Sequence, residues 1–283
     1  MNSDRIILTR VWTDHEIIGR FYLQACRLQV QNYFPESEKN EFFRNISALM
    51  HKLHATRYHL ENYKKIEIRE LKAAQKGFKK HPNETREAFD LIFELEAFLF
   101  QVKSSLDMLV KLLNPIIGRA LVSTKTYEKK GESIIKGLEQ LKNKKNSRKE
   151  EIDQLIKLIR SDKDSWIETV VDYRDELNHF KGLNNFKFIP RQLRHNQIIA
   201  EKPRFKGSEV VSFMQTIYRN NIEFSHDFVC VALSIRMRTG IYLGADTEEN
   251  ALKYFDNMPS AKFVKYCWYL KTNRKGAAAE QGH

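Results

Sequence analysis

TREAFDLIFELEAFLFQVKSSLDMLVKLLN, residues 85–114, is the stretch that decides the fold of this 283-residue chain. Its apolar residues recur at spacings of three and four and leave only a narrow polar strip, which indicates a helix buried on most of its sides. These residues are Leu91, Ile92, Leu95, Phe98, Leu99, Val102, Leu106, Leu109 and Leu113. Because Pro115 follows at once, we expect the helix to end there. The stretch therefore predicts the central helix of a helical protein.

Similar helical patterns flank this segment on both sides. Prolines and glycines separate them, and the expected helices cover residues 14–33, 39–75, 132–160 (as two short helices), 163–180 and 208–237. Asp162 or Asp164 is expected to cap the helix over 163–180, and Gly182 to end it. The prolines between Gly182 and residue 208 predict an irregular or extended stretch. Short strands are expected at Ile241–Leu243 and Ala261–Leu270.

The composition argues against several classes of protein. Three cysteines lie far apart without metal-ligand spacing, which favours reduced thiols in a cytoplasmic protein. The first residues contain too short an apolar run for a signal peptide, and no segment is long enough to cross a bilayer. His51, His54 and His59 fall among lysines and arginines without nearby carboxylates, so we expect them on a solvated helix face. No metal, cofactor or membrane association is expected.

The net charge of +12 is concentrated in parts of the chain. Residues 120–149 contain nine basic and three acidic residues, and residues 186–206 contain six basic residues and one acidic residue. Clustered cations favour contact with RNA or another polyanion. The candidates for nucleic-acid binding are Lys142, Lys144, Lys145, Arg148, Arg191 and Arg194. The alternative is an ordinary solvated surface, which for residues 142–149 would be a mobile loop.

Arg174 and His179 lie near the end of the helix expected over 163–180, in the sequence WIETVVDYRDELNHF of residues 166–180. Arginine can hold a phosphate through its planar set of donors, and histidine can take up or release a proton near pH 7. The pair therefore suits cleavage of an RNA phosphodiester without a metal ion. On an ideal helix the two side chains diverge by about 140°, so convergence needs a frayed last turn or the long reach of arginine. The alternative is a histidine favoured by the helix dipole beside an arginine paired with a carboxylate.

This stretch resembles the Arg-(four to six residues)-His motif of HEPN-domain proteins, an all-helical group that includes many RNases. The order of expected helices from about residue 85 to 238 is similar to the HEPN pattern. The resemblance implies an all-α fold, with a HEPN-like helical bundle over residues 85–240. An N-terminal helical region, residues 1–84, is expected to pack on this core. Residues 241–283 are expected to form an irregular, strand-containing extension with a disordered basic tail.

The segment QVKSSLDMLV, residues 101–110, resembles a small polar patch that several HEPN families carry in the first core helix. By that likeness Ser104, Ser105 and Asp107 are candidates to support the Arg–His pair. The alternative is structural: Lys103 and Asp107 would form an ion pair one helical turn apart on an exposed face, and serine would permit close approach of two helices.

The resemblance implies a metal-independent endoribonuclease. RNA supplies the nucleophile, its 2′-OH, so that the enzyme needs a base, an acid and positive charge at the phosphate. Arg174 would stabilise the phosphate charge and His179 would move protons, while Asp175 would orient either of them and Asn178 would contact phosphate or sugar. One histidine cannot be acid and base at once, and HEPN proteins are generally dimers, so RNA and a second copy of the chain are the expected partners.

Three functions remain open at this point. The first is a cytoplasmic HEPN endoribonuclease, for instance a toxin or phage-defence effector with an antitoxin. The second is a non-catalytic HEPN-like module that binds RNA, a nucleotide or a partner such as a nucleotidyltransferase. The third is a helical interaction protein in which the motif is a coincidence.

Overall fold

Helices dominate the computed structural model, which describes residues 16–30, 32, 34–118, 126–144, 148–178, 186–193, 197–205, 207–245 and 266–270. Within these residues the α-helices are α2 (Glu16–Gln29), α3 (Glu36–Phe78), α4 (Phe89–Ile117), α5 (Glu132–Lys142), α6 (Lys149–Asp162), α7 (Glu168–Asn178) and α8 (Val210–Ser234). A 3₁₀ turn, η1 (Glu128–Gly131), precedes α5, and a π-helical turn, η2 (Lys163–Ile167), joins α6 to α7. The chain is therefore mostly helical, as the sequence predicts.

Three small antiparallel sheets accompany the helices. Strands β1 (Arg86–Glu87), β2 (Lys187–Gln192) and β3 (Ile198–Glu201) pair in the order β1-β2-β3. The other two sheets are the hairpin of β4 (Arg204–Phe205) and β5 (Ser208–Glu209), and the pair of β6 (Ile241–Ala245) and β7 (Tyr266–Leu270). The last pair agrees with the strands expected near residues 241–243 and 261–270. Strands β2 and β3 of the first sheet lie in the stretch after residue 182, where an irregular or extended conformation is expected.

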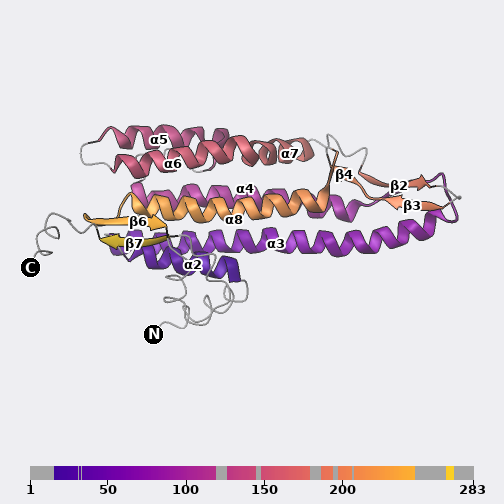
Figure 1. The fold of residues 1–283 in the computed structure, drawn as a ribbon, viewed down its shortest axis with the longest axis horizontal. Helices are drawn as coiled ribbons and strands as arrows, with labels where there is room; N and C mark the ends of the chain where they lie inside the picture. The colour runs from indigo at the N-terminus through magenta and orange to yellow at the C-terminus, as the bar shows by residue number, and fades with distance from the viewer. Residues whose placement is uncertain are drawn as a thin grey trace, which may run out of the picture.

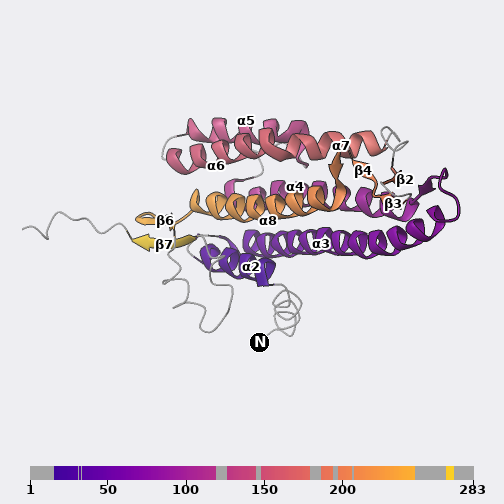
Figure 2. The same cartoon turned by 45° about the vertical axis from the view of Figure 1, so that its right-hand side comes forward.

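The helices stack in three layers, which both views show (Figure 1, Figure 2). Helices α5, α6 and α7 form one layer, α4 and α8 form the middle layer, and α2 and α3 form the third. Helix α6 packs against α8 and α7 against α4, while α3 packs along α4 and also against α8. Among the described residues no helix is both long and apolar enough to span a membrane.

Helix α4 is central because it contacts helices of both outer layers. Its apolar periodicity turns thirteen buried residues toward the neighbouring helices. Leu95, Leu99 and Leu106 are completely buried, so truncating any of them would leave a cavity in the core. The expectation of a central helix is confirmed, but the helix begins at Phe89 and not near residue 85, because Arg86 and Glu87 pair with β2 as a strand.

Pro115 does not end α4, although the sequence predicts that it would, because the helix continues to Ile117. Proline has no N–H to give the carbonyl of Lys111, four residues earlier. That carbonyl instead accepts a hydrogen bond of 3.0 Å from the Asn45 side chain of α3. The neighbouring helix thus satisfies the group that the proline leaves unpaired, and the last turn is kept.

The expected cap at Asp162 or Asp164 is wrong. Helices α6 and α7 form one continuous helical rod through η2, and Asp162 has helical backbone angles of −73° and −33°. A capping residue needs non-helical angles. The Asp162 carboxylate instead accepts a hydrogen bond of 2.6 Å from the indole N–H of Trp166. The extra residue of the π turn shifts the helical register, and both Trp166 and Ile167 are buried there.

The three-stranded sheet is fastened to the C-terminal end of α3, at the end of the molecule opposite α2 and the β6–β7 pair (Figure 1). The Gln75 side chain donates to the Ile198 carbonyl at 2.5 Å and accepts from the Ala200 N–H at 2.8 Å. Glu67, which is buried on α3, pairs with Lys202 just after β3 at 2.8 Å. Phe188 of β2 is fully buried. The sheet is thus held by both polar and apolar contacts.

Candidate functional site

Arg174 lies in the last two turns of α7, four residues after Val170 and three before Leu177. Both of these neighbours are buried, so helical geometry places Arg174 at the border of the core. Its side chain is 23% exposed. Arginine can rest its stem on apolar surface while its guanidinium reaches solvent. The cation is therefore positioned by packing and still accessible to a ligand.

Asp175 holds the Arg174 guanidinium from the next position on the helix. The Arg174 Nε donates to Asp175 Oδ1 at 3.0 Å, and the second bond to the same oxygen comes from Nη2. A guanidinium has five N–H donors, so three are left for a phosphate after these two. Asp175 is half exposed, which limits how strongly the pair is held. The contact orients Arg174, and it also matches the arginine–carboxylate pair that the sequence leaves as an alternative.

The other end of the motif is only partly within the described residues. Asn178 is the last residue of α7. His179 lies outside the described residues, as do Lys145 and Arg194. The closeness of the Arg174 guanidinium and the His179 ring therefore stays a prediction.

The polar residues of α4 make local contacts. Asp107 accepts a hydrogen bond of 2.7 Å from the Tyr127 N–H and pairs with Lys103 one turn earlier at 2.5 Å. Ser105 is fully buried and donates to Asn221 of α8 at 2.8 Å. Ser104 is half-buried. Asp107 anchors the segment before η1, and Ser105 links α4 to α8, so both side chains have a structural role. Their predicted support of Arg174 remains a prediction.

Lys130, a neighbour of this region, links η1 to α7. Its ammonium lies 2.6 Å from Glu168 and 2.9 Å from Asp172. The hydrogen bond that Lys130 donates to Glu168 raises the pKa of Lys130, and the one it donates to Asp172 contributes less. Lys130 therefore balances one of these two negative charges, and Arg174 is the cation that α7 itself carries.

The basic residues predicted to contact nucleic acid differ in whether their side chains already bind other groups of the protein. Lys142 pairs with Asp153 at 2.7 Å, and Arg191 pairs with Glu201 at 2.7 Å across β2 and β3. Arg148 donates to the carbonyls of three residues after α8, at 2.8 to 3.0 Å: Met237, Arg238 and Ile241. Its guanidinium therefore serves to hold the end of α8. Lys144 has no side-chain partner among the described residues and lines a cavity.

This cavity, of about 420 Å³, lies where the ends of five helices meet. Its apolar lining comes from Ile116, Ile117, Leu141, Ile152 and Ile235, and the polar lining from Glu38, Lys144, Arg148 and Arg236, beside Gly118. Arg236 pairs with Glu38 at 2.6 Å, donates to the Pro115 carbonyl and lies 4.7 Å from the centre of the Phe34 ring. Two of its three cations thus hold helix ends together, so the cavity is mainly a structural junction.

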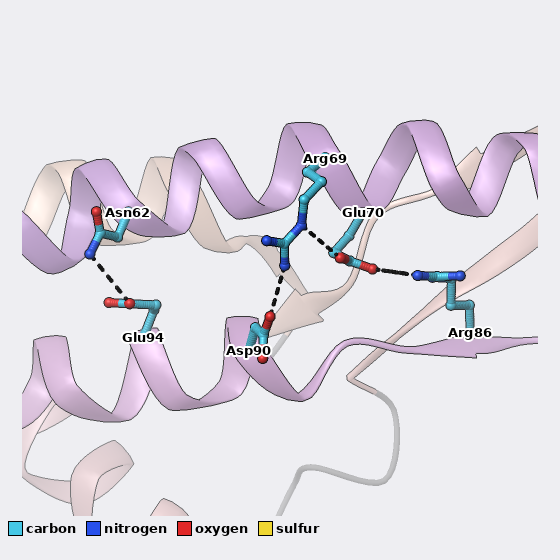
Figure 3. Close-up of polar contacts among 6 residues, drawn as sticks. All are labelled: Asn62, Arg69, Glu70, Arg86, Asp90 and Glu94. Carbon is cyan, nitrogen blue, oxygen red and sulfur yellow. Dashed lines mark hydrogen bonds and ion pairs between the residues drawn. The ribbon is translucent and has the colours of Figure 1, made fainter.

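Sequence reasoning misses a row of polar contacts between α3 and α4 (Figure 3). Asn62 donates to Glu94 at 3.4 Å, and Arg69 to Asp90 at 2.8 Å. Glu70 accepts hydrogen bonds from Arg86 and from Arg69. Both bonds lower the pKa of the Glu70 carboxyl, and the bond from Arg86 has the larger effect. Spacing along α3 alone cannot reveal these pairs, because Glu94 and Asp90 come from α4 and Arg86 comes from β1.

His59 belongs to the same row. Its Nδ1 lies 2.7 Å from Glu94 Oε2 of α4, and both side chains are about four-fifths buried. His51 is exposed, as expected of a solvated face, whereas the expectation of no nearby carboxylate is wrong for His59. Within the described residues no three His, Cys, Asp or Glu side chains gather as metal ligands would.

Comparison with known proteins adds no assignment. No protein-family model, no curated protein and no solved structure matches this chain.

Proposed function

We propose that this protein is a metal-independent endoribonuclease of the HEPN type. The observation that carries the proposal is Arg174, a border cation at the end of a long helix whose guanidinium is oriented by Asp175. It stands five residues before His179 in the sequence. The all-helical surroundings, with α4, α7 and α8 packed together, agree with the family that the motif resembles.

In the proposed reaction the 2′-OH of RNA attacks the adjacent phosphorus and the 5′-oxygen of the next nucleotide leaves. The negative charge on the phosphate oxygens grows in the transition state, where the remaining donors of Arg174 stabilise it. His179 takes the proton from the 2′-OH or gives one to the leaving oxygen. The products carry a 2′,3′-cyclic phosphate and a free 5′-hydroxyl.

A second copy of the chain completes the proposed site. One imidazole cannot accept and donate a proton in the same step, so a dimer that brings two His179 residues near a two-fold axis supplies both roles. Light scattering at micromolar concentration should give about twice the chain mass of 33.5 kDa. A monomer that stays monomeric with RNA bound would favour the non-catalytic binding module instead.

The test is cleavage of mixed RNA by purified protein in EDTA. Arg174→Ala and His179→Ala should each lower the rate by orders of magnitude, since acid–base catalysis alone contributes about 10² to 10⁴-fold. Arg160→Ala and His81→Ala are matched controls, because these side chains are exposed and form their own surface pairs with Glu139 and Glu84. The proposal fails if EDTA abolishes cleavage or if His179→Ala cleaves as fast as the unmodified protein.

The biological setting is part of the same proposal. A cytoplasmic toxin or phage-defence effector would need an antitoxin or another regulator, and a nucleotidyltransferase is a candidate partner of such a module. Growth of a bacterial host on expression of the chain, compared with the His179→Ala variant, tests this setting. Toxicity that the variant retains would contradict it.

A further inference from the structure

The last four turns of α3 carry five exposed cations on one face: Lys65, Arg69, Lys72, Lys76 and Lys79. We call this set the α3 cationic stripe. Its members alternate at spacings of four and three residues, which places them on one side of a helix with neighbouring Cβ atoms about 5 to 6 Å apart. The fourteen steps from first to last extend about 21 Å along the helix. A stripe of this length matches an extended ligand better than a small one.

Within residues 65–79 no exposed carboxylate interrupts the stripe, and the exposed Asp90 of α4 pairs with Arg69. The segment contains two acids, Glu67 and Glu70, and both are turned away from solvent. Glu67 is buried and pairs with Lys202 at 2.8 Å. Glu70 is 14% exposed and pairs with Arg86 at 2.8 Å as well as with Arg69. Each of these two carboxylates therefore forms an ion pair with a residue outside the stripe, Glu67 with Lys202 and Glu70 with Arg86.

The four lysines of the stripe have no carboxylate partner among the described residues, unlike Lys39 and Lys64 of the same helix, which pair with Glu36 and Glu61. Like charges at a spacing of one turn repel one another and weaken a helix. The four lysines, without carboxylate partners of their own, therefore cost stability in the free protein, whereas the charge of Arg69 is offset by Glu70 and Asp90. A bound polyanion would relieve this repulsion.

Exposed aromatic residues occur at the start of α4, the helix that pairs with the stripe through Arg69. Arg69 reaches Asp90 at 2.8 Å, which brings the start of α4 next to α3 (Figure 3). On either side of Asp90 in the sequence are Phe89, which is 58% exposed, and Phe93, which is 62% exposed. Rings in such positions can stack with unpaired bases, while the cations contact phosphates.

A lipid surface fits this region less well. A helix that lies in a membrane interface needs a free apolar face beside its basic face. The apolar face of α3 in this segment is buried in the core through Tyr63, Ala74 and Phe78. Apart from Ile68, the exposed side of this segment is polar, which suits contact with a nucleic acid strand.

We propose that the α3 cationic stripe, together with Phe89 and Phe93, binds single-stranded RNA. The stripe and Arg174 lie in opposite layers of the molecule (Figure 1), so this surface is separate from the proposed cleavage site. It holds a distant part of a long RNA. The choice of RNA as the polyanion rests on the proposed function, whereas binding itself does not require cleavage.

The test is fluorescence anisotropy with a labelled 30-nucleotide oligouridine in EDTA. All proteins are full-length and carry His179→Ala, so that the RNA stays intact. The stripe variant is Lys65→Gln, Lys72→Gln and Lys79→Gln together. Its control is Lys136→Gln, Lys157→Gln and Arg160→Gln, which removes the same charge from exposed positions of α5 and α6. Circular dichroism confirms that both remain helical.

The stripe variant should bind on the order of 10- to 100-fold more weakly at 0.15 M salt, and the slope of log K against log salt should fall by about two. The control should change affinity by only about threefold. Phe93→Ala should weaken oligouridine binding by about tenfold but leave binding of a fully duplex RNA unchanged.

Equal affinity of the stripe and control variants would overturn the inference. So would binding of the stripe to phosphatidylserine vesicles in preference to oligouridine. The result is independent of catalysis: a protein that binds RNA through the stripe but never cleaves it sinks only the proposed function. A protein that cleaves RNA while the stripe variant binds normally sinks only this inference.

Discussion

Substitution of Arg174 tests whether the proposed site needs the planar guanidinium with its paired N–H donors or only a positive charge. Arg174→Lys keeps the charge but loses the paired donors that contact a phosphate on two sides. We therefore expect Arg174→Lys to retain little more RNA cleavage than Arg174→Ala. Thermal stability should change little in both variants, because the pair with Asp175 is partly exposed. Full activity of the lysine variant would show that Arg174 acts as a simple cation.

His54 on α3 makes stability depend on pH. Burial lowers its pKa below 6.5, and the nearby charges of Arg57 and His51 lower it further. As the pH falls through 6.5, the unfolded chain takes up a proton that the folded protein resists, so the free energy of unfolding decreases. His54→Gln removes this contribution and should lose less stability than the unmodified protein between pH 7.5 and 5.5. Urea unfolding at both pH values measures the difference, and His81→Gln is an exposed control.

Single residues also show where sequence reasoning stops. The sequence suggests the contact of Arg174 with Asp175, because the two residues are adjacent, and the structure shows their hydrogen bond. It does not identify the partner of His59, because Glu94 comes from another helix. Nor does it reveal that Asn45 compensates for Pro115. Contacts between residues close in the sequence can be predicted from their spacing. Contacts between different elements can be predicted only when the packing of those elements is known.

At the scale of elements, Gly131 fixes the junction of η1 and α5. Its φ is +96°, and an added Cβ would lie 2.8 Å from the Tyr127 hydroxyl and 2.9 Å from Ile159 Cγ2. Gly131→Ala should therefore destabilise the protein by about 2 to 4 kcal/mol, from backbone strain and overpacking together. Gly207→Ala is the matched control, with a φ of +81° and no atom within 4 Å of the added Cβ.

The control variant should lose only the strain contribution of about 1 to 2 kcal/mol. Urea unfolding of the two variants separates the two causes. Equal losses would mean that Tyr127 and Ile159 move aside without cost.

The helices themselves are largely predictable from their apolar periodicity. Their boundaries differ where another element intervenes, as at Pro115 and at the continuous rod from α6 through η2 to α7. The sheet of β1, β2 and β3 is harder to predict, because its strands are short and come from separate parts of the chain. Short strands gain their stability from the surface they pack on, not from their own sequence.

For the whole molecule, the three layers predict a gradient of local stability. Amide hydrogens of α4 should exchange most slowly, because this helix contacts both outer layers and its apolar residues are buried. The short strands β4 and β5 should exchange fastest among the paired elements. Hydrogen exchange measured by mass spectrometry checks the order, and faster exchange in α4 than in α5 would contradict the central place of α4.

The side chain of Gln75 covers part of the outer edge of β3, where another molecule could otherwise add a strand. In the order β1-β2-β3, strand β3 has a free edge, and an open edge can recruit a strand from another molecule. The Gln75 amide satisfies one carbonyl and one N–H on that edge, as another peptide unit would. Gln75→Leu should therefore promote polymerisation through edge-to-edge pairing, seen as growing light scattering, while Gln140→Leu on the exposed side of α5 should not. One side chain thus keeps the sheet inside a single molecule and closes a route to fibres.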